Sequence, residues 1–309
     1  MPPLVARLRP EESGQMKAPL APGAGGYLWI IPALVLLLVF VYYPIVDNFR
    51  LSLYSWNAFR PVPKFVGLNN YQRVFADPVF WTSIVNNVWY AVVSVAFQVG
   101  IALVLAALLE GVVAPRLRGF LRTVYFIPAT ISITIIGLLF RIIYQPEGLL
   151  NAFLGLLGVE SSRAWLGEQQ TAIWSVIAMS QWQNLGYTTM LFVVAIQRIP
   201  KEYYEAALVD GVGPIRTFFS VTVPLVREMT TLLMIVTISG AFLVFNEIMA
   251  TTQGGPNNSS QVLGTWLYQS AFRNDDMGYA TVVAVVIFVI TFIAAVLQLT
   301  YSRLRRVEQ

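Results

Sequence analysis

The chain has 309 residues, of which 57% are hydrophobic and only 12% are charged, with a net charge of +4 and a mean hydropathy of +0.65. Soluble domains carry about 25% charged residues, so this composition cannot cover a water-facing surface. Cysteine and histidine are absent, which excludes disulfides, thiol nucleophiles, histidine bases and Cys or His metal ligands. An all-α integral membrane protein is the fold class that fits.

The N-terminal 26 residues contain five prolines among scattered charges and glycines. Such a composition resists packing, and we expect residues 1–26 to form a mostly disordered cytoplasmic tail. The apolar run that follows is longer than the core of a signal peptide and lacks a small-residue cleavage site. It therefore predicts an uncleaved first transmembrane helix.

Further apolar stretches follow, each long enough for the ~20 residues that cross about 30 Å of hydrocarbon. The sequence predicts about six transmembrane helices within a domain at residues 27–303, followed by a short cytoplasmic tail at 304–309. An even number of spans puts both termini on one side of the bilayer. The expected spans are 27–46, 84–109, 120–144, 172–196, 229–250 and 279–301.

The positive charges indicate the orientation. Thirteen of the 20 Lys and Arg residues fall on the side of the termini, six fall on the opposite side, and Arg141 lies at a helix end. Positively charged segments stay in the cytoplasm, so we expect both termini there, in the cytoplasmic (inner) membrane of a bacterium or archaeon. The same distribution explains the sequence pI of about 9.3 without a nucleic-acid partner.

Three loops are then expected outside the membrane, at 44–83, 145–171 and 251–278. They are rich in Trp, Tyr, Pro and Asn. Two interpretations of their tryptophans stay open: anchors at the bilayer interface, or direct contacts with a ligand. The tryptophans concerned are Trp56, Trp81, Trp165 and Trp266.

The longest loop expected inside the cell, at 197–228, has an unusual composition. Pro200 suits the start of a short amphipathic helix, and Gly211 suits its end. A second short helix is expected over 214–219, before Pro224 breaks the chain. The pattern alone leaves two interpretations open: a helix that fits into a groove of another protein, or one that lies passively on the membrane.

This loop also carries a recognisable motif. Glu205-Ala206-Ala207, three residues, Gly211, nine residues and then Val221-Thr222-Val223-Pro224 resembles the EAA loop of ABC-importer permeases, E-A-A-x3-G-x9-I-x-L-P. Residues 196–211 are similar to the maltose-type permeases of carbohydrate-uptake ABC transporters. Other segments fit the same family, so the resemblance covers nearly the whole chain except the N-terminal tail. These other matching segments are Trp182 and Gly186, and residues 65–71, 242–248 and 254–260.

The resemblance implies a type I ABC importer permease fold with a cytoplasmic coupling helix at 200–211, which docks into an ATPase subunit. Glu205 would pair with a basic group of the ATPase, while the two alanines would permit close approach. Asp210 has a second interpretation, as a cap of the next helical turn. The ATPase-coupling residues implied are Glu205, Ala206, Ala207, Asp210, Gly211 and Pro224.

No nucleotide site is present in the sequence, which lacks G-x-x-x-x-G-K-[ST] and has no Gly-Lys pair. We therefore expect a transport subunit that is not itself an enzyme and binds no cofactor or metal. The partner ATPase would bind ATP and Mg. The resemblance implies three partners: a second homologous permease, an ATPase dimer, and an extracellular or periplasmic substrate-binding protein.

Polar groups inside the spans are candidates for substrate contact, because each needs a partner within hydrocarbon. Neutral amides and hydroxyls beside aromatic rings, with few cations, suit a sugar or oligosaccharide. In the maltose-type permeases, substrate contacts come from the helices before and after the EAA loop. Several amide side chains at those positions are replaced here by small or apolar residues, which argues against maltose itself as the substrate. The expected substrate-binding residues are Ser180, Gln181, Asn184, Tyr187, Thr237, Gly240, Val244 and Asn246.

Other roles stay open for some of these polar groups. Hydrogen bonds between helices are the alternative for Thr188, Thr189 and Ser239. Glu247 suits gating or ion pairing as well as binding. The same class of importer carrying glycerol 3-phosphate or a polyol is an alternative function. A secondary transporter would show internal repeats and an ion-coupling charge, and an embedded enzyme would show clustered acids or histidines; neither pattern is clear.

Overall fold

The computed structural model describes residues 29–307, so the tail expected at 1–26 lies outside the described residues. The described chain forms two units, residues 29–47 and residues 48–307. The first unit is helical and has a proline in the first turn of its first helix, where a missing N–H is tolerated. Its segments are α2 (Ile31–Leu37), the π-helical segment η1 (Leu38–Tyr42) and α3 (Tyr43–Leu51), which ends in the second unit.

A two-stranded antiparallel hairpin follows α3, in the first loop expected outside the membrane. Tyr54 pairs with Phe65 and Ser55 pairs with Lys64, and an irregularity follows Ser55. The hairpin could not be predicted from the sequence, because strands this short give too weak an alternating pattern. The elements here are β1 (Tyr54–Asn57), β2 (Arg60–Phe65) and the short helix α4 (Asn69–Ala76).

The second predicted span is one continuous helix of 34 residues with a π-helical segment in its middle. It begins before the predicted residue 84 because Asp77 caps it. The Asp77 carboxylate accepts a hydrogen bond of 2.8 Å from the Val79 N–H, which satisfies one of the free donors of the first turn. The helix comprises α5 (Pro78–Ser94), η2 (Val95–Ile101) and α6 (Ala102–Gly111).

The third predicted span is broken into two helices that meet at an angle of 96°. The chain leaves the helical conformation at Ile131 and Ser132. Pro128, in the last turn before the break, removes one backbone donor and crowds the preceding turn. A further short helix follows in the next loop. The elements are α7 (Pro115–Thr130), α8 (Ile133–Ile143) and α9 (Leu149–Leu156).

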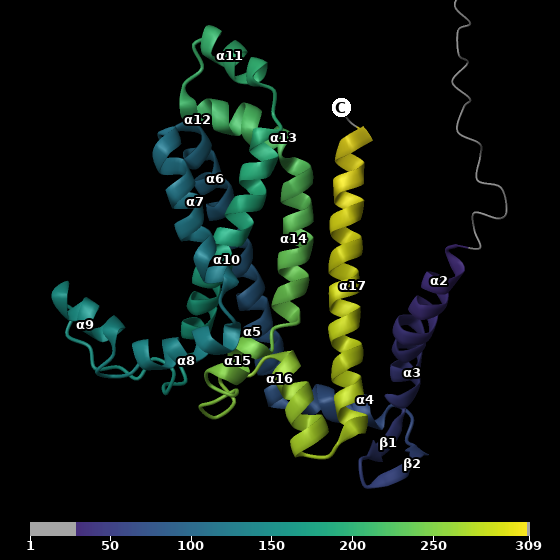
Figure 1. Cartoon of the computed structure of the whole chain (residues 1–309). Coiled ribbons are helices and arrows are strands. Elements are labelled where there is room, and N and C mark those ends of the chain that lie inside the picture. Colours follow the sequence, from purple (N-terminus) through teal and green to yellow (C-terminus); the bar gives the residue numbers. More distant parts are fainter. Residues whose placement is uncertain (1–28, 308–309) are drawn as a thin grey trace, which may run out of the picture. The chain divides into compact units, whose positions relative to one another are not determined.

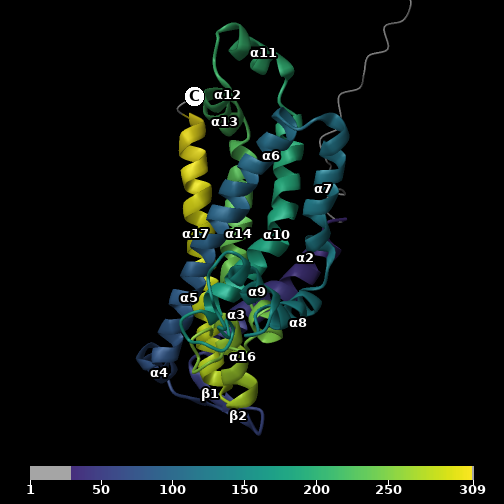
Figure 2. The same ribbon diagram turned by 90° about the vertical axis from the view of Figure 1, so that its left-hand side faces the viewer.

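The fourth predicted span is the 26-residue helix α10 (Ala172–Gln197). It packs against α6 and α7, and Figure 2 shows the three helices side by side. Gly186 permits the approach to α7, because a Cβ atom there would lie 1.6 Å from the Tyr125 carbonyl oxygen. The next long helix, α14 (Arg227–Phe242), packs against α5 and α17. These contacts bury two apolar clusters in the second unit.

The loop between α10 and α14 contains short helices at both positions where the sequence predicted them. A bend of 72° then leads into α14, and the fifth predicted span stops at Phe242 rather than continuing to 250. Figure 1 shows α11 and α12 at one end of the second unit, and the hairpin and α16 at the opposite end. The remaining elements are α11 (Lys201–Val209), α12 (Pro214–Thr217), η3 (Phe218–Thr222), α13 (Val223–Leu225), α15 (Asn246–Ala250), α16 (Leu263–Tyr268), η4 (Gln269–Arg273) and α17 (Met277–Val307).

Within the described residues, three helices are long and apolar enough to cross a membrane, and five if each bent pair counts as one span. The three are Ile31–Leu51, Pro78–Gly111 and Met277–Thr300. The sequence predicted about six. α10 has the necessary length, but the polar run between Ser180 and Thr189 lowers its hydropathy.

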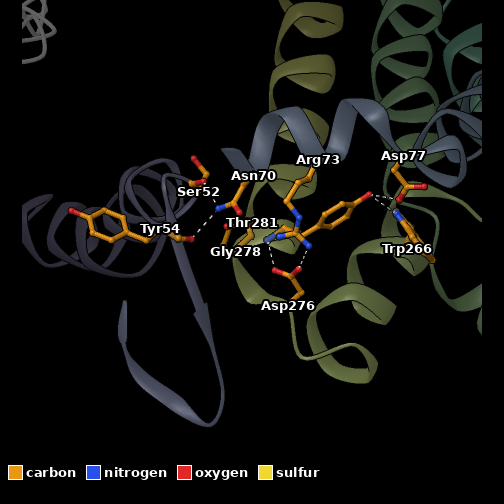
Figure 3. A network of polar contacts seen from close by, with 10 residues as sticks. Ser52, Tyr54, Asn70, Arg73, Asp77, Trp266, Asp276, Gly278 and Thr281 are labelled. Atoms are coloured by element: carbon orange, nitrogen blue, oxygen red, sulfur yellow. Dashed lines mark hydrogen bonds and ion pairs between the residues drawn. The ribbon is translucent and has the colours of Figure 1, made fainter. Parts of the chain in front are cut away.

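Polar contacts near the hairpin join α4 and the start of α5 to the start of α17 (Figure 3). The Tyr279 hydroxyl donates to the Asp77 carboxylate and accepts from Trp266 Nε1 at 3.0 Å, while Arg73 pairs with Asp276. The Asn70 amide donates to the carbonyl oxygens of two residues around the start of β1. These bonds measure 2.9 and 3.0 Å, to Ser52 and Tyr54 respectively.

Candidate functional site

A pocket of about 200 Å³ lies between α5, α10 and α14. Six of the eight predicted substrate-binding residues line it. On α10 they recur three and four residues apart, so that their side chains share one face of the helix. The six are Ser180, Asn184, Tyr187, Thr237, Gly240 and Val244.

The face of α10 in this pocket is polar and partly accessible. Tyr187 is exposed and Asn184 is half-buried. The Asn184 amide donates to the Ser180 carbonyl oxygen at 3.0 Å, which fixes its orientation along the helix. Thr188 also lines the pocket, and its hydroxyl donates to a backbone carbonyl of its own helix. The hydroxyl of Thr189, which is fully buried outside the pocket, makes the same kind of bond. Hydroxyls, one amide and one aromatic ring are therefore available to a ligand.

The other two predicted substrate-binding residues lie elsewhere. Gln181 is buried in the contact between α10 and the second span: its Oε1 accepts from Gln98 at 2.9 Å, and its Nε2 donates to Ser94 Oγ at 3.1 Å. Its geometry is that of a bond between helices. Asn246 is exposed at the start of α15 and does not line the pocket.

Besides Thr188, four polar residues line the pocket without having been predicted as substrate-binding. Three of them, Tyr90, Ser94 and Gln98, recur every four residues and form a polar stripe along the second predicted span. That spacing is the signal that would have identified them. The fourth is Glu247, in the first turn of α15. Tyr90 is 2% exposed, and its hydroxyl makes no hydrogen bond of normal geometry within the described part of the chain.

A second cavity, of about 330 Å³, lies beside the start of α11. Glu110, at the end of α6, lines this cavity and lies at the centre of a cluster of charged side chains. Its carboxylate pairs with Arg118 at 3.2 Å and with Arg122, and it accepts a hydrogen bond of 3.2 Å from Gln197 at the end of α10. These contacts join three helices directly beneath the predicted coupling helix.

The predicted coupling residues lie on and beyond α11. Gly211 has a φ of +70°, a conformation that favours glycine and ends the helix. Ala207 is 8% exposed, whereas Leu208 and Val209 are 78% and 87% exposed. Asp210 follows the last turn of α11, and α12 begins without a side-chain cap. The exposed coupling candidates are Glu205, Ala206, Asp210, Gly211 and Pro224.

One hydrogen bond ties α11 to the segment that follows it. The hydroxyls of Tyr204 and Thr222 lie 3.1 Å apart, and Thr222 is buried.

Two separate regions are candidates for function: a polar pocket among the long helices, and an exposed short helix at one end of the second unit (Figure 1). Within the described residues, no group of three or more acidic side chains is placed to hold a metal ion.

Known proteins resemble this chain in both sequence and fold. The family model described as the binding-protein-dependent transport system inner membrane component matches residues 98–307. The probable ABC transporter permease protein YurN of Bacillus subtilis (strain 168) is 49% identical over 284 residues, 91% of this chain and 97% of that protein. The lactose transport system permease protein LacF of Rhizobium radiobacter is 32% identical over 287 residues, 91% of this chain and 95% of that protein.

A solved structure has the same fold. It belongs to a bacterial ABC transporter involved in the import of the acidic polysaccharide alginate, and it matches with a TM-score of 0.78 at 21% identity. The match covers 90% of this chain and 94% of that chain. The family predicted from the EAA motif is thereby confirmed, and so is the predicted fold class. This chain belongs to the family of binding-protein-dependent transport system inner membrane components.

Proposed function

We propose that this chain is the permease subunit of an ATP-driven, binding-protein-dependent importer and forms half of the translocation pathway for a sugar or oligosaccharide. The pocket between α5, α10 and α14 is the observation that carries the proposal. Neutral hydroxyls, the amides of Gln98 and Asn184, and the Tyr187 ring line it beside one carboxylate, and this combination suits the OH groups and C–H faces of a sugar. Relatives that carry a substrate name include a lactose permease.

The same pocket argues against one of the substrates considered from the sequence, glycerol 3-phosphate. No Lys or Arg is among its described lining residues, so it offers no counter-charge to glycerol 3-phosphate. An uncharged polyol meets no such obstacle, although nothing in the pocket favours it over a sugar. A secondary transporter is a poorer fit than an importer, since the family depends on a binding protein.

The short helix α11 is the proposed coupling helix. It would dock into a cleft of an ATPase subunit and transmit the closure of the ATPase dimer to α10 and α14, the long helices on either side of it. The exposed Glu205 and the exposed apolar side chains of Leu208 and Val209 fit a surface that a partner covers. The ATPase would supply ATP and Mg, and this subunit would hydrolyse no ATP itself.

The complete importer would contain a second, homologous permease, an ATPase dimer and an extracellular or periplasmic binding protein. Both termini and α11 would face the cytoplasm, because 13 of the 20 Lys and Arg residues lie on that side. The hairpin and α16 would then face the binding protein. Loaded binding protein would dock outside, ATP would open the pocket outward, and hydrolysis would reset it.

Affinity purification from gently solubilised native membranes tests this assembly. The expected result is co-purification of a second polytopic permease and an ATPase with a P-loop, identified by mass spectrometry. The binding protein encoded beside them would then be screened against neutral sugars by calorimetry. Isolation of the chain alone, or only with copies of itself, would contradict the proposal.

A further inference from the structure

The described lining of the pocket between α5, α10 and α14 carries negative charge only. Glu247 is the one acidic residue among its described lining residues, and no Lys or Arg lines it. Ion pairs in the described part of the chain involve other acids, namely Glu110, Glu168 and Asp276, and none involves Glu247. Within the described residues, no neighbouring cation therefore neutralises the charge of the Glu247 carboxylate.

An unneutralised carboxylate acts strongly on a charge that enters the same small cavity. Coulomb interactions are screened less among packed helices than in water, so the effect extends across a pocket of this size. Another anion would be repelled, and its own desolvation would add to the cost of entry. A protonated amine would be attracted, and a neutral sugar would be accepted without either effect.

A second observation indicates that the same part of the pocket is prepared for a polar ligand. Tyr90 is 2% exposed and lines the pocket, and its hydroxyl interacts with the Ser180 side chain and with Glu247 but makes no hydrogen bond of normal geometry within the described residues. A buried hydroxyl of this kind is normally satisfied. Hydroxyl or amino groups of a substrate would satisfy Tyr90 and Glu247 together.

We propose that Glu247 is a specificity-determining residue, which restricts this pathway to neutral or amine-bearing sugars and excludes sugars that carry a carboxylate or phosphate. The proposal rests on the proposed function, since it assumes that the substrate passes through this pocket.

The absence of cysteine from the native sequence makes the charge of the pocket measurable without knowledge of the substrate. Gly240→Cys would place one thiol in the pocket, at a position where a Cβ atom meets nothing within 4 Å. The thiol would be labelled, in the intact complex in proteoliposomes, with two methanethiosulfonate reagents: one that carries a trimethylammonium group and one that carries a sulfonate. The ratio of the two labelling rates reports the local potential.

With Glu247 present, we expect a ratio that favours the cationic reagent by roughly tenfold over the ratio at a control thiol, Ser162→Cys, in an exposed loop. Glu247→Gln should bring the pocket ratio to the control value and leave the control ratio unchanged. A pocket ratio that stays the same after the Glu247→Gln substitution would overturn the proposal. If Gly240→Cys fails to assemble, Asn184→Cys reports on the same pocket.

Transport gives a separate answer. The matched hexoses glucose, glucosamine and glucuronate would be offered, each joined to the sugar that the binding protein accepts, and uptake would be compared. Uptake of the glucuronate conjugate at the rate of the neutral one would overturn the charge proposal and leave the importer function standing. Failure of every sugar to be transported, with the labelling ratio as expected, would instead contradict the proposed function.

Discussion

The backbone carbonyl oxygen of Tyr125 on α7 faces Gly186 on α10 so closely that a Cβ atom on Gly186 would lie 1.6 Å from it. The obstacle is backbone rather than a flexible side chain, so any substitution at Gly186 must move a helix. α10 also lines the polar pocket, and the Tyr125–Gly186 contact therefore fixes the position of the residues that we assign to the substrate.

Gly186→Ala should destabilise the subunit by about 1–3 kcal/mol, the usual cost of overpacking, even though alanine favours helices. Gly119→Ala on α7 is the matched control, because its Cβ would meet nothing within 4 Å and should leave stability unchanged or slightly higher. Thermal midpoints measured by size-exclusion chromatography in detergent would rank the two variants. Equal midpoints would contradict the close contact.

Glu110 should be among the most sensitive charged residues. Its side chain is 12% exposed and compensates two arginines, so Glu110→Ala leaves Arg118 and Arg122 without their shared counter-charge. Removing one partner of a partly buried pair should cost about 1–3 kcal/mol, between the values for exposed and for fully buried pairs. The exposed pair of Arg163 and Glu168, 3.5 Å apart, provides the control, and Glu168→Ala should cost less than about 1 kcal/mol.

The same thermal assay in detergent applies to both charge variants. A midpoint for Glu110→Ala no lower than that for Glu168→Ala would show that the cluster at the end of α6 contributes little to stability. In that case its bonds to α7 and α10 would not constrain the region next to α11.

Asp77 has two structural roles, which two substitutions separate. It caps α5 through the Val79 N–H and accepts a hydrogen bond from Tyr279 on α17 (Figure 3). Asp77→Ala should lose both contacts and cost about 1–2 kcal/mol for the cap alone. Tyr279→Phe should lose only the second contact and destabilise less. A larger loss for Tyr279→Phe than for Asp77→Ala would contradict this division.

The sequence predicted the number of long apolar segments better than it predicted their continuity. Hydropathy remains high across the 96° bend at Ile131 and past the end of α14 at Phe242, because a packed helix that bends or ends needs the same apolar residues as a straight span. Local signals were present at each break. Pro128 precedes the first, and Gly240 lies two residues before the second.

The site was predicted in part for a related reason. The residues of α10 in the pocket form a dense polar run that the sequence makes obvious, whereas Ser94 and Gln98 are isolated polar residues in an apolar helix. Two features relate Ser94 and Gln98 to the pocket: their four-residue spacing and their contacts with α10 in the folded chain. Gln181 lies outside the pocket because a polar run contains residues on every face of a helix, including the face that bonds to the neighbouring helix.

The proposed coupling role of α11 leads to a test at Glu205. Its side chain is exposed, so Glu205→Ala should leave insertion and the thermal midpoint unchanged, yet weaken association with the ATPase and abolish uptake. Glu160→Ala is the control: it removes an exposed carboxylate from a loop far from α11 in the sequence, and it should change neither association with the ATPase nor uptake. Normal uptake by the Glu205 variant would remove the basis for the coupling helix.

The division of α10 into a pocket face and a packing face predicts opposite phenotypes for neighbouring amides. Asn184 lines the pocket, so Asn184→Ala should lower uptake at subsaturating substrate about tenfold and change the thermal midpoint little, since one good hydrogen bond to substrate is worth about 1.4 kcal/mol. Gln181 bonds to Gln98 and Ser94, so Gln181→Ala should lower the midpoint more than it changes the substrate concentration for half-maximal uptake. Uptake and stability measured on the same preparations separate the two. The reverse pattern would assign the substrate to the other face of α10.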